Sequence, residues 1–213
     1  MSDPGDAAPG PTRRAFLGAT AATAATAGCS LLPEEQEPIE ASADAPTFLP
    51  EAVASAHGYA ETIAEETTLS VSVTVDLSGD VQISNTREVI ADVYRRGYAA
   101  NGRRFGVVTA PAVAVIEQPE VVRDPVAALS DARSVELASG IDASGVGDRA
   151  ESRSLTVLGN DVTGETTTAT VDGGAVELER VRVRAGSDAV TAIAVTPDGT
   201  DGDAPFGELS RDA

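Results

Sequence analysis

Apolar and polar residues alternate through much of the chain with the period of two that β-strands require. The clearest case is residues 69–77, whose apolar members are Leu69, Val71, Val73, Val75 and Leu77. This alternation predicts a half-buried strand. Two further apolar stretches follow at about 81–96 and at 105–117, and the second contains Pro111. Since proline cannot donate a hydrogen bond to a sheet ladder, we expect an edge, bulge or break at that position.

Two segments carry helix signals. Residues 50–56 begin with Pro50 and Glu51, and Gly58 follows as a stop. The second segment opens with Asp124-Pro125, an N-cap residue followed by proline in the first turn, and it is expected to continue to about residue 138. The sequence therefore predicts one short helix before the first long strand and a longer helix in the middle of the chain.

The last third of the chain reads as a run of strands. Four apolar stretches occur at 154–158, 162–171, 175–184 and 189–196, with Gly, Asn and Asp clusters between them. Such short turns force neighbouring strands to be antiparallel, because a parallel crossover needs about a dozen residues. We therefore expect an α+β domain: an antiparallel β-sheet of about six to eight strands, ending in a four-strand meander, with one or two helices on one face.

The ends of the chain are low in apolar residues. Residues 29–46 are rich in Pro, Glu and Ala, and residues 198–213 are rich in Asp and Gly. These compositions are typical of extended, solvated segments. The sequence thus predicts a signal peptide at 1–28, a disordered acidic tether at 29–46, one α+β domain at 47–197, and a flexible acidic tail at 198–213.

The first 28 residues have the features of an export signal. Arg13 and Arg14 stand in the pattern Thr-Arg-Arg-Ala-Phe-Leu, and a stretch of Ala, Thr and Gly follows at 18–27. That stretch is too short to span a bilayer, which needs about 20 apolar residues. Cys29 comes next, after Thr-Ala-Gly, in the setting of a lipobox. We expect twin-arginine export, cleavage before Cys29, and a lipid on its thiol.

The charge of the chain indicates the salt conditions in which the protein is stable, and says little about its fold. The formal net charge is −19, the 15 basic residues include no lysine, and aromatic residues make up 3% of the chain. A compact chain with this charge repels itself unless salt screens it, and the Debye length falls to about 3 Å at 1 M salt. The composition therefore favours a halophilic protein. An acidic protein with a basic partner is the alternative.

Taken together, these features resemble the haloarchaeal twin-arginine lipoproteins of a domain-of-unknown-function family. The resemblance rests on the Arg13-Arg14 signal, Cys29, the helix near Pro50, Asp124-Pro125 and the stretch 155–159 that opens the meander. It implies location and fold, and no catalytic residues.

Residues that commonly carry catalysis are scarce. The one histidine, His57, lies beside Gly58 at an expected helix end, where contact with the last carbonyl groups is the simpler interpretation. With Cys29 assigned to lipid, no zinc site of the usual kind can form. The sequence at 145–150 has glycine spacing like a dinucleotide motif but lies in a loop before a strand. Residues 198–203 lack the acid spacing of a calcium loop. No cofactor and no metal are expected.

Arginines form the one basic stripe in the chain. Arg180, Arg182 and Arg184 share one face of an expected strand, and Val181 and Val183 point to the other. An anion or partner contact is one interpretation, and cross-strand pairing with acids is the other. Two arginine pairs, 95–96 and 103–104, flank a turn and have the same two interpretations. Nucleic acid is not expected as a partner, because no basic face dominates.

Three functions remain open. The first is a non-catalytic binding or accessory module, held on the outer face of the cell membrane through Cys29, with a membrane protein as its partner, or secreted if Cys29 is not lipidated. The second is a surface hydrolase that uses carboxylates, and the third is a structural envelope component. We favour the first, and therefore expect no enzyme activity, because no catalytic group of residues stands out.

Overall fold

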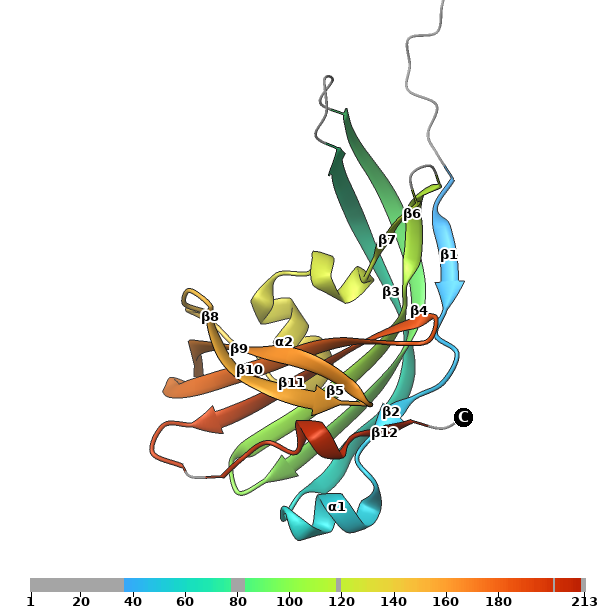
Figure 1. Cartoon of the computed structure of the whole chain (residues 1–213). Helices are drawn as coiled ribbons and strands as arrows, with labels where there is room; N and C mark the ends of the chain where they lie inside the picture. Colours follow the sequence, from blue (N-terminus) through green and yellow to red (C-terminus); the bar gives the residue numbers. More distant parts are fainter. Residues whose placement is uncertain (1–36, 78–82, 118–119, 201, 212–213) are drawn as a thin grey trace, which may run out of the picture. The chain divides into compact units, whose positions relative to one another are not determined.

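One mixed sheet of eight strands dominates the part of the chain that the structure describes, residues 37–77, 83–117, 120–200 and 202–211 of a computed structural model (Figure 1). The strand order is β1-β4-β5-β11-β10-β9-β8, and β3 pairs with the other edge of β4. Its strands are β1 (Ile39–Ser42), β3 (Ala60–Leu77), β4 (Ile83–Ala100), β5 (Arg103–Pro111), β8 (Ala150–Val157), β9 (Asn160–Val171), β10 (Gly174–Ala185) and β11 (Asp188–Pro197). The β1–β4 pair is parallel, and the other pairs are antiparallel. The predicted α+β class and mainly antiparallel sheet are confirmed.

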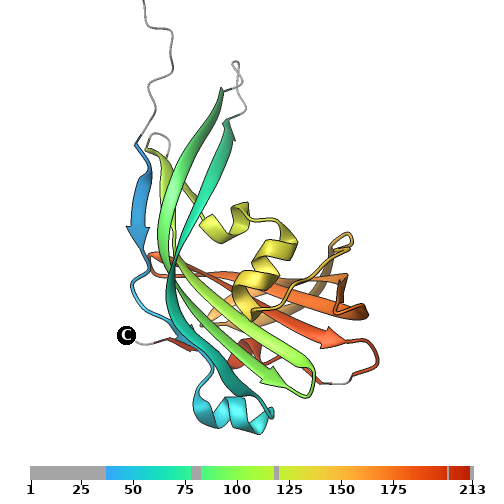
Figure 2. The same cartoon turned by 180° about the vertical axis from the view of Figure 1, so that it is seen from behind.

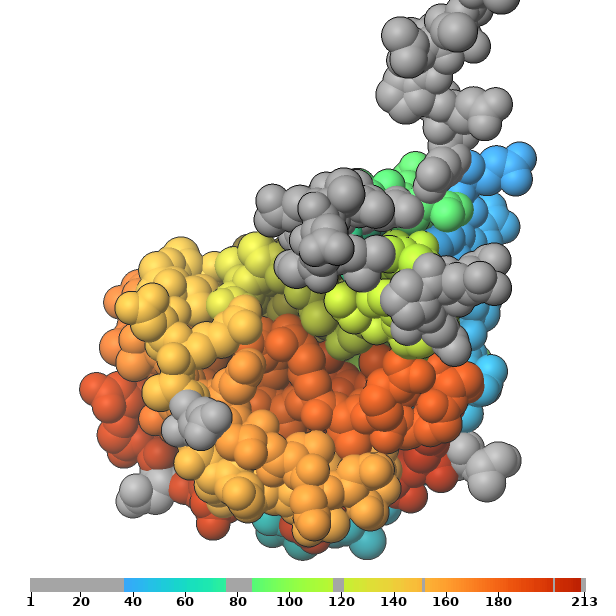
Figure 3. All heavy atoms as spheres, turned by 45° about the horizontal axis from the view of Figure 1, so that its top comes forward, coloured from blue at the N-terminus to red at the C-terminus, as the bar shows by residue number. Residues whose placement is uncertain are grey.

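The four expected strands of the meander are β8 to β11, each paired with the next through a tight turn. In Figure 3 their atoms form one continuous surface. The alternating stretch 69–77 is the second half of β3, with Leu69, Val73 and Val75 buried. The expected break at Pro111 is also present, because β5 ends there and β6 (Val113–Glu117) begins after Ala112.

Two small two-stranded sheets flank the main one. β6 pairs with β7 (Glu120–Arg123), and β2 (Thr47–Phe48) pairs with β12 (Ser210–Arg211). The β6–β7 hairpin lies beside the β3–β4 ribbon at one end of the domain, and α1 (Glu51–Ala56) lies at the opposite end (Figures 1 and 2). The short helix expected at 50–56 is therefore present.

The longer expected helix is two helices. A 3-10 helix, η1 (Pro125–Ala128), follows the Asp124 cap, and α2 (Asp131–Ser139) begins after a second cap, Ser130. The prediction of one continuous helix over 124–138 was wrong because Leu129 is extended, with ψ at 154°. The Ser130 side chain accepts a hydrogen bond from the Arg133 amide, which starts a new helix at that point.

The expectation of helices on one face of the sheet was also wrong. η1 and α2 cover one face, over a cluster that includes Val89, Val108 and Ile193. α1 and a C-terminal 3-10 helix, η2 (Phe206–Glu208), cover the other face. Helices are needed on both faces because the central strands β5 and β11 are buried along almost their whole length.

The packed domain extends beyond the expected 47–197 at both ends. Residues 39–42, placed in the disordered tether by the sequence, form β1 along β4. Within the expected flexible tail, Phe206 is fully buried and Leu209 is 7% exposed. These corrections share one cause: a few apolar residues in an acidic stretch become partly or fully buried once a distant part of the chain provides a surface for them.

α2 is held tightly against the sheet. Its C-terminal end crosses β5 at Gly106, which lies against the Ala138 carbonyl group. The Arg95 guanidinium, on β4, donates to the Leu137 and Glu136 carbonyl oxygens at 2.5 and 3.4 Å. The last carbonyl groups of a helix lack partners within it, and the Gly140 amide binds the Glu136 oxygen; this arginine provides a partner for Leu137 and fixes the end of α2.

Candidate functional site

The arginine stripe lies on β10, as the alternation predicted. Arg180 and Arg182 lie on the face covered by η1 and α2, whereas Val181 and Val183 are buried in the core of the opposite face. Arg184 is exposed near the end of the strand. The three arginines therefore have different environments, and only the first two are enclosed by the helical layer.

Arg180 is bound by two carboxylates. Glu165 is its direct cross-strand neighbour on β9, and the Glu165 Oε2 atom accepts from Arg180 Nε at 3.1 Å and from Nη2 at 2.5 Å. Asp131, in the first turn of α2, accepts from Arg180 Nη1 at 2.8 Å. Arg180 is 7% exposed. Cross-strand pairing thus accounts for this arginine, and its donors are directed at the protein's own acids.

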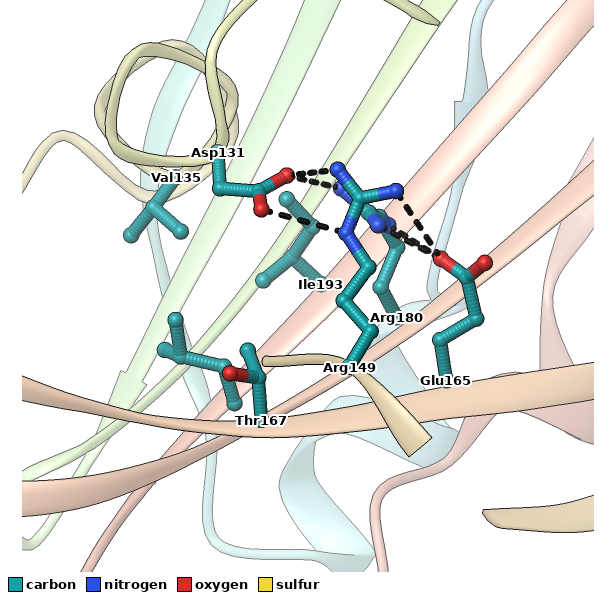
Figure 4. A pocket seen from close by; sticks show the side chains of 8 residues that line it. Asp131, Val135, Arg149, Glu165, Thr167, Arg180 and Ile193 are labelled. Carbon is teal, nitrogen blue, oxygen red and sulfur yellow. Dashed lines mark hydrogen bonds and ion pairs between the residues drawn. The ribbon is translucent and has the colours of Figure 1, made fainter. Parts of the chain in front are cut away.

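Arg149 lies over this pair and joins the same two acids (Figure 4). Its guanidinium donates to both carboxylate oxygens of Asp131 and lies 3.9 Å from Glu165 Oε2. Burial acts to raise the pKa values of Asp131 and Glu165, but the hydrogen bonds from the arginines outweigh it, and both pKa values lie below their ordinary ones. The hydrogen bond to Asp131 raises the pKa of Arg149. Asp131, Glu165 and Arg149 are therefore charged at neutral pH.

The cluster continues beneath η1. Arg182 Nη1 lies 3.9 Å from Glu165 Oε2. The charge of the nearby Asp124 carboxylate acts to raise the pKa of Arg182. Asp124 caps η1 by accepting from the Val126 amide at 2.8 Å and accepts from Thr191 at 3.3 Å. Burial raises the pKa of Asp124, and these contacts offset only part of that effect. Burial also lowers the pKa of Arg182.

Six charged residues thus alternate in sign beneath η1 and α2: Asp124, Arg182, Glu165, Arg180, Asp131 and Arg149. Their formal charges cancel. A cavity of about 20 Å³ lies between the cluster and Val135, Leu178 and Ile193, which is room for about one water molecule. The charge cluster therefore connects the helical layer to the meander and has no space for an organic ligand.

A larger concave surface lies beside α1. This α1 groove has a volume of about 630 Å³, within the range of small ligand sites. It lies between α1, β2 and the paired ends of β3 and β4; its lining residues are Phe48, Leu49, Glu51, Ala54, Ser55, Tyr59, Ala60, Glu61, Arg96 and Tyr98. The Tyr98 hydroxyl accepts from the Leu49 amide at 2.9 Å. Burial raises the pKa values of Tyr59 and Tyr98, so both phenols stay protonated.

Aromatic side chains concentrate behind this groove. Phe105 contacts the rings of Tyr59, Tyr98 and Phe206, with ring centroids 5.3 to 6.2 Å apart. The chain has seven aromatic residues, four Phe and three Tyr, so this cluster uses most of them. Arg96 on the groove floor lies 3.8 Å from Glu61, and its Nε has no hydrogen-bond partner among the described residues. The α1 groove is therefore open and largely polar, whereas the charge cluster is closed.

The remaining candidates have local roles or lie outside the described part. His57 ends α1, as expected, but the expected contact of its side chain with the last carbonyl groups was wrong, because its ring nitrogen lies 2.6 Å from a Glu208 carboxylate oxygen, which ties α1 to η2. Arg103 lies over the Tyr59 ring at 5.1 Å and donates to the His57 carbonyl oxygen. Cys29, Arg13 and Arg14 lie outside the described residues. Within the described ranges, no three of His, Cys, Asp or Glu converge as metal ligands, and no helix is long and apolar enough to cross a membrane.

The sequence pattern predicted the arginines but not their partners. Glu165 had a usable signal: the Asp172-Gly173 turn pairs Val171 with Gly174, and counting outward places Glu165 opposite Arg180. Asp131 and Arg149 had none, because their positions depend on how α2 and the loop before β8 pack on the sheet. The α1 groove was also missed, since its walls come from two parts of the chain, residues 48–61 and residues 96–98, that lie far apart in the sequence.

From the geometry of this cluster we predict that replacing Arg180 lowers the stability more than replacing Arg149. Replacing Arg180 with methionine is expected to lower the free energy of unfolding by about 2 kcal/mol, because two partly buried acids lose a partner while Arg149 still binds both. Replacing the exposed Arg149 with methionine is expected to cost about 0.5 kcal/mol. Urea unfolding followed by circular dichroism measures both. Equal losses for the two variants would contradict the order of burial seen here.

Comparison with known proteins identifies a family for the chain but no activity. A family model described as a domain of unknown function (DUF6517) matches residues 46–212. No curated protein and no solved structure shows significant similarity to the chain. The matched region includes η2 and β12, in agreement with the packed C-terminal segment.

Proposed function

The chain belongs to the DUF6517 family, and we propose that it is a lipid-anchored binding module on the outer face of a cell membrane. The observation that carries the proposal is the position of Cys29, the one cysteine of the chain, after a twin-arginine pattern and eight residues before the first described residue, Glu37. A signal, a lipid-accepting thiol and a folded domain follow one another in the order that an anchored exported protein requires.

The length of chain between Cys29 and the domain limits how far the domain can lie from the lipid. Eight residues span at most about 29 Å when fully extended. The chain enters the domain at β1, whose first residue, Ile39, pairs with Val89. In this proposal, the end of the domain with the start of β1 and the β6–β7 hairpin faces the membrane, and α1 with its groove faces away (Figure 1). The groove then remains accessible to a partner.

The geometry supports binding over catalysis. The described acids with lowered pKa values, Asp131 and Glu165, are bound by arginines, so they are poor proton donors or acceptors at neutral pH. A carboxylate-dependent hydrolase is the alternative, and Asp124 is the described acid whose pKa is raised. Its two carboxylate oxygens accept hydrogen bonds from Val126 and Thr191. Those contacts give Asp124 a structural role as the cap of η1.

The charge of the chain supports a halophilic setting for this module. At −19 and without lysine, the protein is expected to unfold at low salt and to be stable in molar salt, where its carboxylates are screened. We propose a halophilic archaeon as the source, with the twin-arginine pathway delivering the folded domain. Nucleic acid is not proposed as a partner.

Membrane fractionation tests the anchor. The wild-type protein is expected in the membrane fraction after a carbonate wash, and Cys29→Ser is expected in the soluble fraction or the medium, because the lipid is the proposed attachment. Ser30→Ala, beside it, should remain with the membrane. Arg13→Lys combined with Arg14→Lys should leave unprocessed precursor inside the cell. If Cys29→Ser stayed in washed membranes, the lipid anchor would be refuted.

A further inference from the structure

One edge of the main sheet is open. Within residues 37–77, 83–117, 120–200 and 202–211, β3 pairs with β4 and with no strand on its other side. The opposite edge, β8, is interrupted by a register shift between Glu151 and Ser154 and is contacted by η2. β3 is 18 residues long, and residues 64, 65, 66 and 68 are exposed. An exposed strand of this kind is a template for another strand.

The orientation of the β3 backbone follows from β4. The Asp92 carbonyl oxygen accepts from the Ala43 amide, so this residue of β4 points its backbone groups away from β3. In an antiparallel pair the direction alternates from one residue to the next. Val93 and Arg95 therefore face β3, and their partners Thr67 and Glu65 face β4. The N–H and C=O groups of Ala64, Glu66 and Thr68 then point outward, along the open edge.

The charges along this edge indicate what kind of strand it accepts. Glu65 and Glu66 point to opposite faces of the sheet, and Glu65 is paired with Arg95 at 2.5 Å. Glu66 lies on the same face as Asp92, the cross-strand neighbour of Thr68, and neither acid has an arginine partner among the described residues. A second copy of the chain would place acids against acids, which destabilises cross-strand pairs. A strand with basic side chains would instead lie beside Glu66 and Asp92 on one face of the sheet. Its main-chain hydrogen bonds would also persist in high salt, where charge pairs are screened.

We propose that the edge of β3 between Ala64 and Thr68 binds an extended, basic segment of a partner protein as an added strand. This inference rests on the proposed binding function and names its surface. In this mode of recognition, main-chain hydrogen bonds supply the affinity and alternate side chains supply the specificity. The edge begins beside the α1 groove, whose lining includes Ala60 and Glu61. A longer partner segment would therefore extend into that groove.

A peptide of alternating valine and lysine, nine residues long, tests the proposal on the mature chain carrying Cys29→Ser. This lipid-free protein makes the result independent of the anchor. The peptide is expected to slow amide exchange at Ala64, Glu66 and Thr68, measured by NMR, by about tenfold or more. Glu66→Pro should weaken binding by about tenfold or more, because it removes an outward N–H and leaves the pairs with β4 intact.

Glu66→Gln is the matched control and should keep most of the affinity, since its backbone is unchanged. Glu66→Lys is a second variant that does not depend on proline being tolerated. It should weaken binding of the lysine peptide and strengthen binding of a peptide of alternating valine and glutamate. The proposal is overturned if the lysine peptide does not bind at millimolar concentration. It is also overturned if binding protects amides elsewhere, or if Glu66→Pro folds and binds as well as the wild type.

Discussion

Replacing Gly106 with alanine is expected to lower the free energy of unfolding by about 3 kcal/mol or more. Gly106 lies in β5 directly beneath the C-terminal end of α2. A Cβ at this position would overlap the Ala138 carbonyl group and come within 2.9 Å of the Ser139 nitrogen. These are backbone atoms, so no side-chain rotation can relieve the overlap. α2 would have to move away from the sheet.

Gly174→Ala is the matched control for this change. Gly174 also lies in a strand, but an added Cβ would meet only the Val171 carbonyl oxygen, at an ordinary 3.5 Å. Its unfolding free energy should change by less than about 1 kcal/mol. Urea unfolding of the three proteins measures the difference. A Gly106→Ala protein as stable as the control would show that α2 does not lie as close to β5 as the structure places it.

The parts of the fold that sequence predicted are those set by neighbouring residues. The alternation from Leu69 to Val75 gave a correct strand and its buried face. The meander was correct because tight turns, such as Asp172-Gly173, leave antiparallel pairing as the available arrangement. The placement of Arg180 and Arg182 on one face followed from the same alternation. In each case a few adjacent residues determine the outcome.

The parts that sequence missed are set by distant contacts. Residues 60–68 lack alternation, yet they form the first half of β3, because β4 provides a partner for the whole length of that strand. β1 lies in an acidic, proline-rich stretch and forms a strand by pairing with β4. Asp131 could not be singled out among the 34 acidic residues, and Glu165 could be found only by counting outward from the Asp172-Gly173 turn. Their role depends on arginines from β10 and from the loop before β8.

The C-terminal segment is also held by contacts with distant parts of the chain, and this leads to a second prediction with a large expected effect. Replacing Phe206 with alanine is expected to lower the free energy of unfolding by about 3–5 kcal/mol. Phe206 is fully buried, and its ring meets Phe105 edge-on at 5.3 Å between centroids. In a core built mostly from small aliphatic residues, loss of one of few aromatic rings leaves a cavity that the surrounding strands cannot fill.

Two variants separate this packing role from a general effect of changing the segment. Asp203→Ala alters a side chain that is 88% exposed and should change stability by less than about 0.5 kcal/mol. Phe206→Leu restores much of the lost volume and should recover part of the loss. Urea unfolding with the tyrosine signal reports on the same aromatic cluster. If residues 198–213 were a flexible tail, Phe206→Ala would be as stable as the wild type; the structure predicts instead that this one ring accounts for much of the attachment of the C-terminal segment to the domain.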